Sequence, residues 1–308
     1  MITGIDIGGT KCAVVLSDGF EILDKVKFET ADRDSTLERI FDTVRKLGKT
    51  DRIGVSCGGP LDSKRGIIMS PPNLPGWDNV RITEMLEKEF GVPAFLRNDA
   101  DACALAEWKY GAGRGSQNMI FLTCGTGMGA GIILNGKLYS GTCGMAGEIG
   151  HVRMRSHGPV GYGKEGSFEG FCSGGGIAQI GRTVATEKLQ TGGVTGYCGG
   201  YDELQKITAK SIAAAAGQGD PDALEVYRVF ARMLGEGISV LIDILNPEVI
   251  VIGSIFARCE NLIRPHMEEV IKREALTHSY AMCRILPAQL GEAVGDYAAL
   301  SVALEGED

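Results

Sequence analysis

The chain opens twice in the same way, and this repetition constrains its fold more than any other feature. Residues 1–29 read as three short strands separated by turn residues, and residues 118–140 repeat the pattern with a two-residue hairpin signal at Asn135-Gly136. Alternating helix and strand patterns follow each opening. One α/β architecture used twice is therefore expected, in a chain of 308 residues that is long enough for two domains with a core each.

Apolar spacing predicts the elements that follow the two openings. In the clearest helix, apolar residues from Leu37 to Leu47 recur at the three- and four-residue intervals of one helical face. Strands are expected at 52–59, 93–98, 248–254 and 283–288. Helices are expected at 35–48, 82–91, 99–111, 174–186, 208–216, 221–245 and 258–275, with an Ala-rich helix at the C-terminus.

Composition and charge exclude several classes of protein. The formal net charge of −8 argues against a general nucleic-acid binder, whose surface is basic. No apolar run reaches the ~18 residues of a membrane span, and the first residues, MITGIDIGGT, lack the features of a signal peptide. The nine cysteines form no C-x-x-C pair, and several, such as Cys12 and Cys124, stand among apolar residues. A cytoplasmic protein without a nucleic-acid or membrane partner is expected.

Two glycine-rich turns occupy equivalent places, each in the first hairpin of its half. They are DIGGTK (6–11) and CGTGMGAG (124–131). Glycines let backbone amides approach phosphate oxygens, and a threonine hydroxyl adds a donor. Either turn alone is also typical of an ordinary tight hairpin, but the pair, with Asp6 placed to organise a metal ion, favours phosphate binding. A Walker-A-like run at 158–164 is rejected, because Glu165 replaces the Ser or Thr that binds Mg²⁺ and no buried strand precedes it.

A polar, glycine-rich stretch at 147–170 carries a further candidate site. Glu148 and His151 stand within one turn of each other, and Glu169 follows 18 residues after the histidine. Such a set is able to hold a metal, run proton chemistry or bind a polar ligand. The spacing alone leaves these three interpretations open.

Taken in order along nearly the whole chain, these motifs resemble the ROK (repressor, open reading frame, kinase) sugar kinases of the actin/hexokinase/Hsp70 superfamily. The resemblance is carried by DIGGTK, GPLDSKRGIIMSPPNLPGW, NDADACALAE, LTCGTGMGAGIILNGKLYSG, GEIGH and NPEVIVIG. It implies two RNase-H-like α/β domains of the actin/hexokinase type, with sugar and ATP in the cleft between them. The small N-terminal domain is expected to span 1–112 and to take back 292–308, and the larger C-terminal domain to span 113–291.

The same resemblance implies the binding residues. The first phosphate loop would be formed by Asp6, Gly8, Gly9, Thr10 and Lys11, and the second by Gly125, Thr126 and Gly127. Gly253 would lie beneath the adenosine, and Asp6 would organise the Mg²⁺ that accompanies ATP, directly or through water. The sugar-binding positions would be Gly59, Asn73, Asn98, Asp99, Glu148, His151 and Glu169, with Asp99 as the catalytic base.

The chemistry of these residue types agrees with that assignment. Phosphoryl transfer needs an acceptor hydroxyl held in line with the γ-phosphate, and a carboxylate such as Asp99 accepts the proton that the hydroxyl releases. Taken alone, Asp99 is more readily interpreted as the N-cap of the helix that follows than as a base, although Asn98 is able to share the capping. Sugars present many hydroxyls, which carboxylates, amides and imidazoles bind by charge-assisted hydrogen bonds, so the stretch at 147–170 is interpreted as binding a polar ligand.

The chain departs from the family at a metal site. The family places a zinc after the histidine, with the pattern C-x-C-G-x-x-G-C-x-E, and this chain has Val160, Tyr162 and Ser167 at the cysteine positions. Structural zinc requires four ligands, of which His151 alone remains, so no structural zinc is expected and activity should survive chelation once Mg²⁺ is restored. Other candidate ligands match no zinc spacing: Cys143, Cys172, Cys198 and His157.

Two smaller departures leave the implied catalytic groups in place. Asp101 stands where the family often has Asn. Gly253-Ser254 stands where the family usually has two glycines near the adenosine.

The expected function is that of an ATP-dependent kinase for the 6-hydroxyl of glucose or a glucose-like hexose. Mannose, allose and N-acylated hexosamines remain alternative acceptors, and polyphosphate an alternative donor. A sugar-sensing ROK regulator is disfavoured because the first phosphate motif begins at Asp6 and leaves no room for a DNA-binding domain, and a related activator ATPase is disfavoured because clustered cysteine ligands are missing. The resemblance also implies a homodimer.

Overall fold

The computed structural model describes residues 1–305 and divides the chain into two compact units. Unit 1 holds Met1–Ser116, Gly131–Ala146 and the chain from Gln289 onward, and unit 2 holds Gln117–Ala130 and Gly147–Ala288. Helices and strands alternate after each opening, so the expected mixed α/β class is confirmed. The domain boundaries expected from the sequence stay a prediction.

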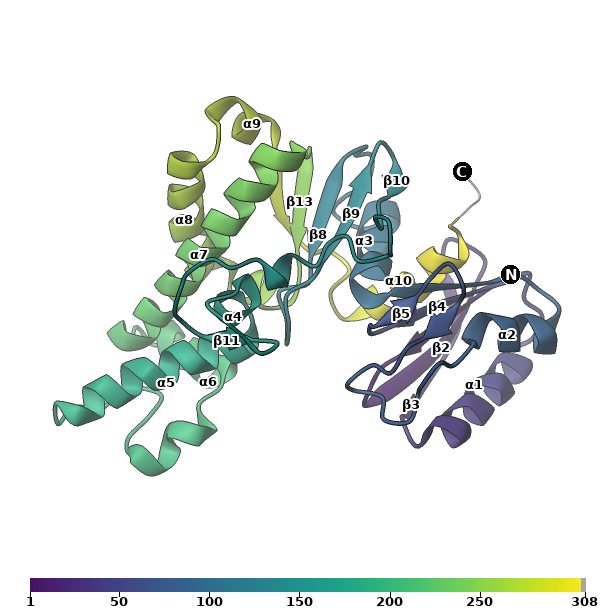
Figure 1. Cartoon of the computed structure of the whole chain (residues 1–308), viewed down its shortest axis with the longest axis horizontal. Helices are drawn as coiled ribbons and strands as arrows, with labels where there is room; N and C mark the ends of the chain where they lie inside the picture. The colour runs from purple at the N-terminus through teal and green to yellow at the C-terminus, as the bar shows by residue number, and fades with distance from the viewer. Residues whose placement is uncertain (306–308) are drawn as a thin grey trace. The chain divides into compact units, whose positions relative to one another are not determined.

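Unit 1 is built on a five-stranded sheet with helices on both faces (Figure 1). In chain order its main elements are β1 (Ile2–Ile7), β2 (Lys11–Ser17), β3 (Ile22–Glu29), α1 (Arg33–Leu47), β4 (Arg52–Cys57), α2 (Ile82–Phe90), β7 (Ala94–Asn98), α3 (Asp99–Tyr110) and α10 (Val294–Ala303). The strand order is β3-β2-β1-β4-β7, and β1 pairs antiparallel with β2 and parallel with β4. Neighbouring valines of β2 face opposite sides, since Val14 packs with Ile40 of α1 whereas Val15 packs with Leu300 of α10.

Two facing glycines bring the C-terminal helix against this sheet. Gly4 of β1 and Gly54 of β4 are paired in the sheet register. A Cβ added at Gly4 would lie 2.9 Å from the backbone N of Leu300, and one added at Gly54 would lie 2.2 Å from the carbonyl oxygen of Ala299. The backbone of α10 therefore rests where no side chain fits, and the last described helix is part of the N-terminal unit.

The second sheet repeats the strand order of the first. Its strands are β8 (Met119–Leu122), β9 (Ala130–Leu134), β10 (Lys137–Leu138), β13 (Val249–Ile252) and β14 (Arg284–Pro287), in the order β10-β9-β8-β13-β14. As in the first sheet, an antiparallel pair stands at one end and two parallel pairings at the other. Asn135 and Gly136 have φ values of 52° and 70°, which confirms the two-residue hairpin between β9 and β10. The architecture predicted from the two openings is present twice.

Helices of unit 2 enclose its largest core. They are α4 (Phe168–Cys172), α5 (Gly174–Gln190), α6 (Ala209–Gly217), α7 (Pro221–Leu245), α8 (Ser254–Glu274) and α9 (Thr277–Met282). The 3₁₀ turn η1 (Ile149–His151) precedes α4, and η2 (Tyr201–Lys206) lies between α5 and α6. α8 begins four residues before the expected start, and a kink at Cys259 separates this added turn from the predicted helix. The sequence missed α4, α9 and the two-stranded ribbons β5 (Leu61–Asp62) with β6 (Ile67–Ile68) and β11 (Val160–Gly161) with β12 (Lys164–Glu165), because they are too short for a periodic pattern.

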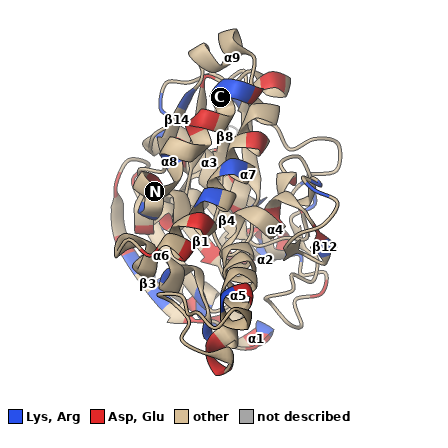
Figure 2. Ribbon diagram, turned by 90° about the vertical axis from the view of Figure 1, so that its left-hand side faces the viewer, with Lys and Arg blue, Asp and Glu red and all other residues tan. Residues whose placement is uncertain are grey.

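Charges of both signs are mixed along the elements that face the viewer in Figure 2, in keeping with the charged fraction of 23%. Within residues 1–305, none of the helices has the length and apolar character needed to cross a membrane.

Candidate functional site

The first glycine-rich turn connects β1 to β2 and carries all five residues assigned to the first phosphate loop. It is closed by the amide of Gly8, which donates to the carbonyl oxygen of Lys11 at 3.1 Å, and by the hydroxyl of Thr30, which donates to the carbonyl oxygen of Gly8 at 2.6 Å. A Cβ at Gly9 would lie 2.5 Å from the carbonyl oxygen of Asn73. The turn therefore requires glycine at position 9 and places a predicted sugar-binding residue directly beside the predicted phosphate loop.

Asp6 stands at the end of β1 in a group of carboxylates. Its pKa is raised to about 6, chiefly by burial and in smaller part by the negative charges of Asp99 and Asp296, whereas a hydrogen bond with Ser56 and the charge of Lys27 oppose the shift. A cation bound here would relieve the repulsion among these carboxylates, which fits the Mg²⁺ of a nucleotide. No group of three or more acidic, histidine or cysteine side chains able to hold a metal occurs within residues 1–305, so phosphate and water oxygens would complete the coordination.

At the start of α3, helix capping and the predicted catalytic role belong to two different residues, Asn98 and Asp99. The side chain of Asn98 is the N-cap and accepts from the amide of Asp101 at 2.7 Å. Asp99 is thereby released from capping, and the residue is accessible to solvent, with the neighbouring amide of Ala100 donating to Oδ1 at 2.9 Å. Desolvation by the surrounding protein raises the pKa of Asp99, so the carboxylate binds a proton more strongly than a free aspartate does.

Asp101 lies in the same turn, and the sequence did not predict that its carboxyl group is buried with one oxygen lacking a hydrogen-bond partner. Its side chain is 1% exposed, Oδ2 accepts from the amide of Asn98 at 3.2 Å and from the hydroxyl of Ser140 at 3.4 Å, and Oδ1 has no hydrogen-bond partner. Burial raises the pKa of Asp101 to about 7, with Glu305 and Asp99 adding to the shift and Arg97 and Ser140 opposing it. The signal in the sequence was the departure from the family's Asn at this position.

The second glycine-rich turn lies in unit 2 between β8 and β9. The amide of Gly125 donates to the carbonyl oxygen of Gly127 at 3.0 Å, and its own carbonyl oxygen accepts from Gly174, the first residue of α5, at 2.9 Å. Gly253 ends β13 beside this turn and donates to the carbonyl oxygen of Leu122 at 2.9 Å. Ser254 has a φ of 50°, which explains why a second glycine suits this position in the family.

The polar stretch at 147–170 lies against the second turn. Glu169, in α4, accepts from the amide of Met128 through Oε2 at 3.0 Å, and a Cβ at Gly127 would lie 2.8 Å from the same oxygen. Glu148 and His151 border η1, and both are exposed, as residues that meet a ligand must be. The structure therefore brings a predicted sugar-binding carboxylate to the predicted phosphate loop in unit 2, as Asn73 meets Gly9 in unit 1.

The three residues at the family's cysteine positions lie at separate places in the structure. Val160 pairs with Glu165 in the β11–β12 hairpin, Tyr162 stands at the turn of that hairpin, and Ser167 is the N-cap of α4 through its bond from the amide of Gly170 at 3.0 Å. The expectation that no structural zinc is present stays a prediction.

The predicted residues form one set in each unit. Unit 1 holds the first phosphate loop with Gly59, Asn73, Asn98 and Asp99, and unit 2 holds Gly125, Thr126, Gly127, Gly253, Glu148, His151 and Glu169. Packing does not explain why position 59 is a glycine, because a Cβ added there would meet nothing within 4 Å.

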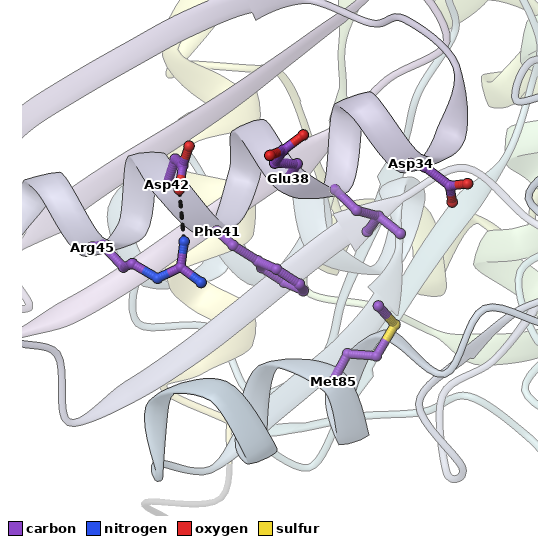
Figure 3. Close-up of a pocket in the computed structure, with 7 residues that line it drawn as sticks. Asp34, Glu38, Phe41, Asp42, Arg45 and Met85 are labelled. Atoms are coloured by element: carbon purple, nitrogen blue, oxygen red, sulfur yellow. Dashed lines mark hydrogen bonds and ion pairs between the residues drawn. The ribbon is translucent and has the colours of Figure 1, made fainter.

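A surface cavity elsewhere has a different chemistry. It has a volume of about 350 Å³ and lies between α1 and α2, where Asp34, Glu38 and Asp42 line it beside Phe41 and Met85 (Figure 3). Three carboxylates against one guanidinium, that of Arg45, make this cavity unsuitable for a phosphate.

Two sheets of the same strand order, each with a glycine turn after its first strand, define the actin/hexokinase class of α/β folds. The chain belongs to the ROK family, whose model matches residues 2–305. The fold class and the family inferred from the sequence are thus confirmed.

Individual relatives carry different activities. The glucokinase of Thermotoga maritima is 33% identical over 279 residues, which cover 88% of this chain and 87% of that protein. The xylose repressor of Caldicellulosiruptor bescii is 28% identical over 305 residues, covering 94% of this chain and 74% of that protein. The crystal structure of a ROK glucokinase from Streptomyces griseus in complex with glucose and AMPPNP matches with a TM-score of 0.77 and 28% identity, over 99% of each chain.

Proposed function

We propose that this chain is an ATP-dependent sugar kinase that phosphorylates the 6-hydroxyl of glucose or of a glucose-like hexose. The observation that carries the proposal lies at the start of α3. There the side chain of Asn98 caps the helix, so the exposed residue Asp99 is available as a proton acceptor. The similarity to glucokinases, one of them solved with glucose and AMPPNP, supports it.

The two glycine-rich turns would hold ATP. Backbone amides of residues 8–11 and 125–127 would bind phosphate oxygens, and the hydroxyls of Thr10 and Thr126 are exposed and available as further donors. Gly253 would lie beneath the adenosine. Mg²⁺, held through Asp6 and the phosphates, would neutralise charge on the transferred group.

The sugar would be bound by amide, carboxylate and imidazole groups. Asn73, Asn98 and the backbone at Gly59 would contribute from unit 1, and Glu148, His151 and Glu169 from unit 2. Because Asn98 already uses its oxygen for the cap and one N–H for Asp101, a single amide N–H remains for a hydroxyl. Glu169 Oε2 is oriented by the amide of Met128, so its other oxygen is free to accept.

In the reaction, the acceptor oxygen would form a bond to the γ-phosphorus while the bond from that phosphorus to the ADP oxygen breaks. Asp99 would take the proton that the hydroxyl loses. Desolvation strengthens this base by raising its pKa, which is the direction that proton abstraction requires.

A coupled assay of ADP release, with and without each hexose of a panel at fixed ATP and Mg²⁺, tests the proposal. Turnover that depends on glucose or a related hexose is expected. The panel should include mannose, allose and N-acetylated hexosamines, with polyphosphate as a second donor. Glucose binding measured by calorimetry without any turnover would favour a sugar-sensing protein, as the similarity to a repressor allows. ATP hydrolysis indifferent to sugar would contradict both.

The homodimer implied by the family resemblance is proposed on that ground alone. Light scattering coupled to size-exclusion chromatography gives the mass, which should be about twice 32.7 kDa.

A further inference from the structure

The β11–β12 hairpin presents an aromatic ring at its tip. Its strands pair Val160 with Glu165 and Gly161 with Lys164, so Tyr162 and Gly163 form the turn, with φ values of 45° and 74°. The side chain of Tyr162 is 71% exposed, although tyrosine is among the residues that folding usually buries at least in part.

Neither the backbone nor the core of the protein accounts for a tyrosine at this position. A positive φ is costly for a bulky residue, and glycine or asparagine would adopt it with less strain. A ring exposed to this extent adds little to the stability of the hydrophobic core. Strain retained at an exposed position points to a function for the side chain.

The ring of Tyr162 lies against a predicted sugar-binding residue. Its centroid is 5.2 Å from that of His151, with the two planes at 88° in an edge-to-face arrangement. Both side chains are exposed, so the pair presents an imidazole and an aromatic face together to a ligand.

Hydrogen bonds fix the hairpin that carries this ring. The amide group of Gln179, in α5, accepts from the backbone N of Val160 and donates to its carbonyl oxygen, both at 2.9 Å. The ammonium of Lys164 donates to the carbonyl oxygen of His151 at 2.5 Å. A Cβ at Gly161 would lie 2.5 Å from the backbone N of Gly170, so the hairpin also packs closely on α4.

We propose that Tyr162 is a further sugar-contacting residue, whose ring forms an apolar wall beside His151, and that Gln179 is the positioning residue that holds it there. The inference rests on the proposed function. A hexose carries C–H groups on its ring faces as well as hydroxyls at its edge. Polar residues satisfy the hydroxyls, and an aromatic ring excludes water from a C–H face, which adds affinity.

The first test replaces Tyr162 by Gly, which removes the ring and relieves the positive φ. We expect the KM for the preferred hexose to rise about five- to tenfold, with the KM for ATP unchanged and the melting temperature equal to or above that of the wild type. Tyr162→Phe keeps the ring and should stay within about twofold of the wild type. Tyr201→Gly removes another exposed tyrosine, from η2, and is the matched control, with no change in KM.

An unchanged hexose KM in Tyr162→Gly would overturn the inference. If that variant does not fold, Tyr162→Asn takes its place, because asparagine tolerates the left-handed region. A wild-type protein that neither turns over nor binds any hexose would overturn the proposed function as well, whereas an active wild type with an unaffected glycine variant would overturn this inference alone.

The second test asks whether Gln179 acts through Tyr162. Gln179→Leu keeps the bulk of the side chain and removes both bonds to Val160. Its hexose KM should rise with kcat unchanged, and the double variant with Tyr162→Gly should show no further rise. Multiplicative effects of the two changes would contradict the positioning role.

Discussion

At the start of α3, neighbouring polar residues do not compete to cap the helix. These residues are Asn98, Asp99 and Asp101. The amides at the start of a helix attract any nearby side-chain oxygen, and a carboxylate used in this way is a weaker base. Because Asn98 accepts from the amide of Asp101, the helix start is satisfied by a neutral group. The exposed Asp99 then accepts locally from the amide of Ala100 and remains available to a substrate.

Asp99→Asn tests the proposed base. The substitution keeps the size of the side chain and removes its ability to take a proton, so kcat should fall by about 10²–10⁴ with hexose affinity nearly unchanged. Steady-state kinetics and calorimetry measure the two quantities. Turnover near that of the wild type would remove Asp99 from the reaction.

Asp101→Asn tests the cost of a buried carboxyl with an unpartnered oxygen. The pKa of about 7 in the folded protein lies above the ordinary value of 3.8 for an aspartate, so between about pH 4 and pH 7 the unfolded chain loses this proton first. The wild type should therefore lose stability as the pH rises through this window. The variant should match it near pH 4 and exceed it by about 2–4 kcal/mol above pH 7.

Urea unfolding at pH 4.5 and pH 8 measures this difference. Asp24→Asn, which removes a carboxylate from an exposed position on β3, is the control. A stability difference that is equal at the two pH values would contradict the prediction.

At the scale of the element, each glycine turn is joined to a polar residue from elsewhere in its own unit. Gly9 meets the backbone of Asn73, and Gly127 meets the carboxylate of Glu169. A residue assigned to the sugar therefore packs against each loop assigned to phosphate. The two ligands would thus be bound by connected parts of the structure.

Gly127→Ala and Gly125→Ala separate the two roles of the second turn. A Cβ at Gly127 would lie 2.8 Å from Oε2 of Glu169, which must then move, so both the hexose KM and the ATP KM should rise. A Cβ at Gly125 would have Ser254 Oγ as its nearest neighbour, at 3.2 Å, so mainly the ATP KM should rise.

Kinetics with each substrate varied in turn measure both effects. A Gly127→Ala variant with unchanged KM for the hexose would show that the contact with Glu169 does not orient a sugar ligand.

At the scale of the whole molecule, the first strand and the last described helix belong to one unit. The paired glycines of β1 and β4 accept the backbone of α10, so nearly 250 residues separate Gly54 from the helix residues that it contacts. Loop closure over such a length costs entropy, which the close packing of α10 has to offset.

Gly54→Val tests this packing. The new Cβ would lie 2.2 Å from the carbonyl oxygen of Ala299, so α10 must move away and unit 1 should lose about 3 kcal/mol or more. Both tryptophans, Trp77 and Trp108, lie in unit 1, so tryptophan fluorescence during urea unfolding reports on that unit.

Gly58→Val is the control, because a Cβ there would meet nothing within 4 Å. Equal unfolding midpoints for the Gly54 and Gly58 variants would mean that α10 does not depend on the glycine pair.

Many helices, strands and turns of this protein are determined by residues close together in the sequence, and these elements could be predicted from it. The repeated opening, the Asn135-Gly136 hairpin, the long helices and the glycine turns depend on residues within a few positions of one another, and the pattern of side chains records such relations directly. The order of the motifs was enough to indicate the family.

Only the tertiary structure decided which distant residues touch. It joined 131–146 to the first unit, set Glu169 on the amide of Met128, left one oxygen of Asp101 without a partner, and placed Tyr162 against His151 on a hairpin too short to leave a pattern. These contacts depend on how packed elements approach one another. Two elements pack closely only where the side chains of both leave room for each other, and the local sequence of one element does not specify the shape of the other.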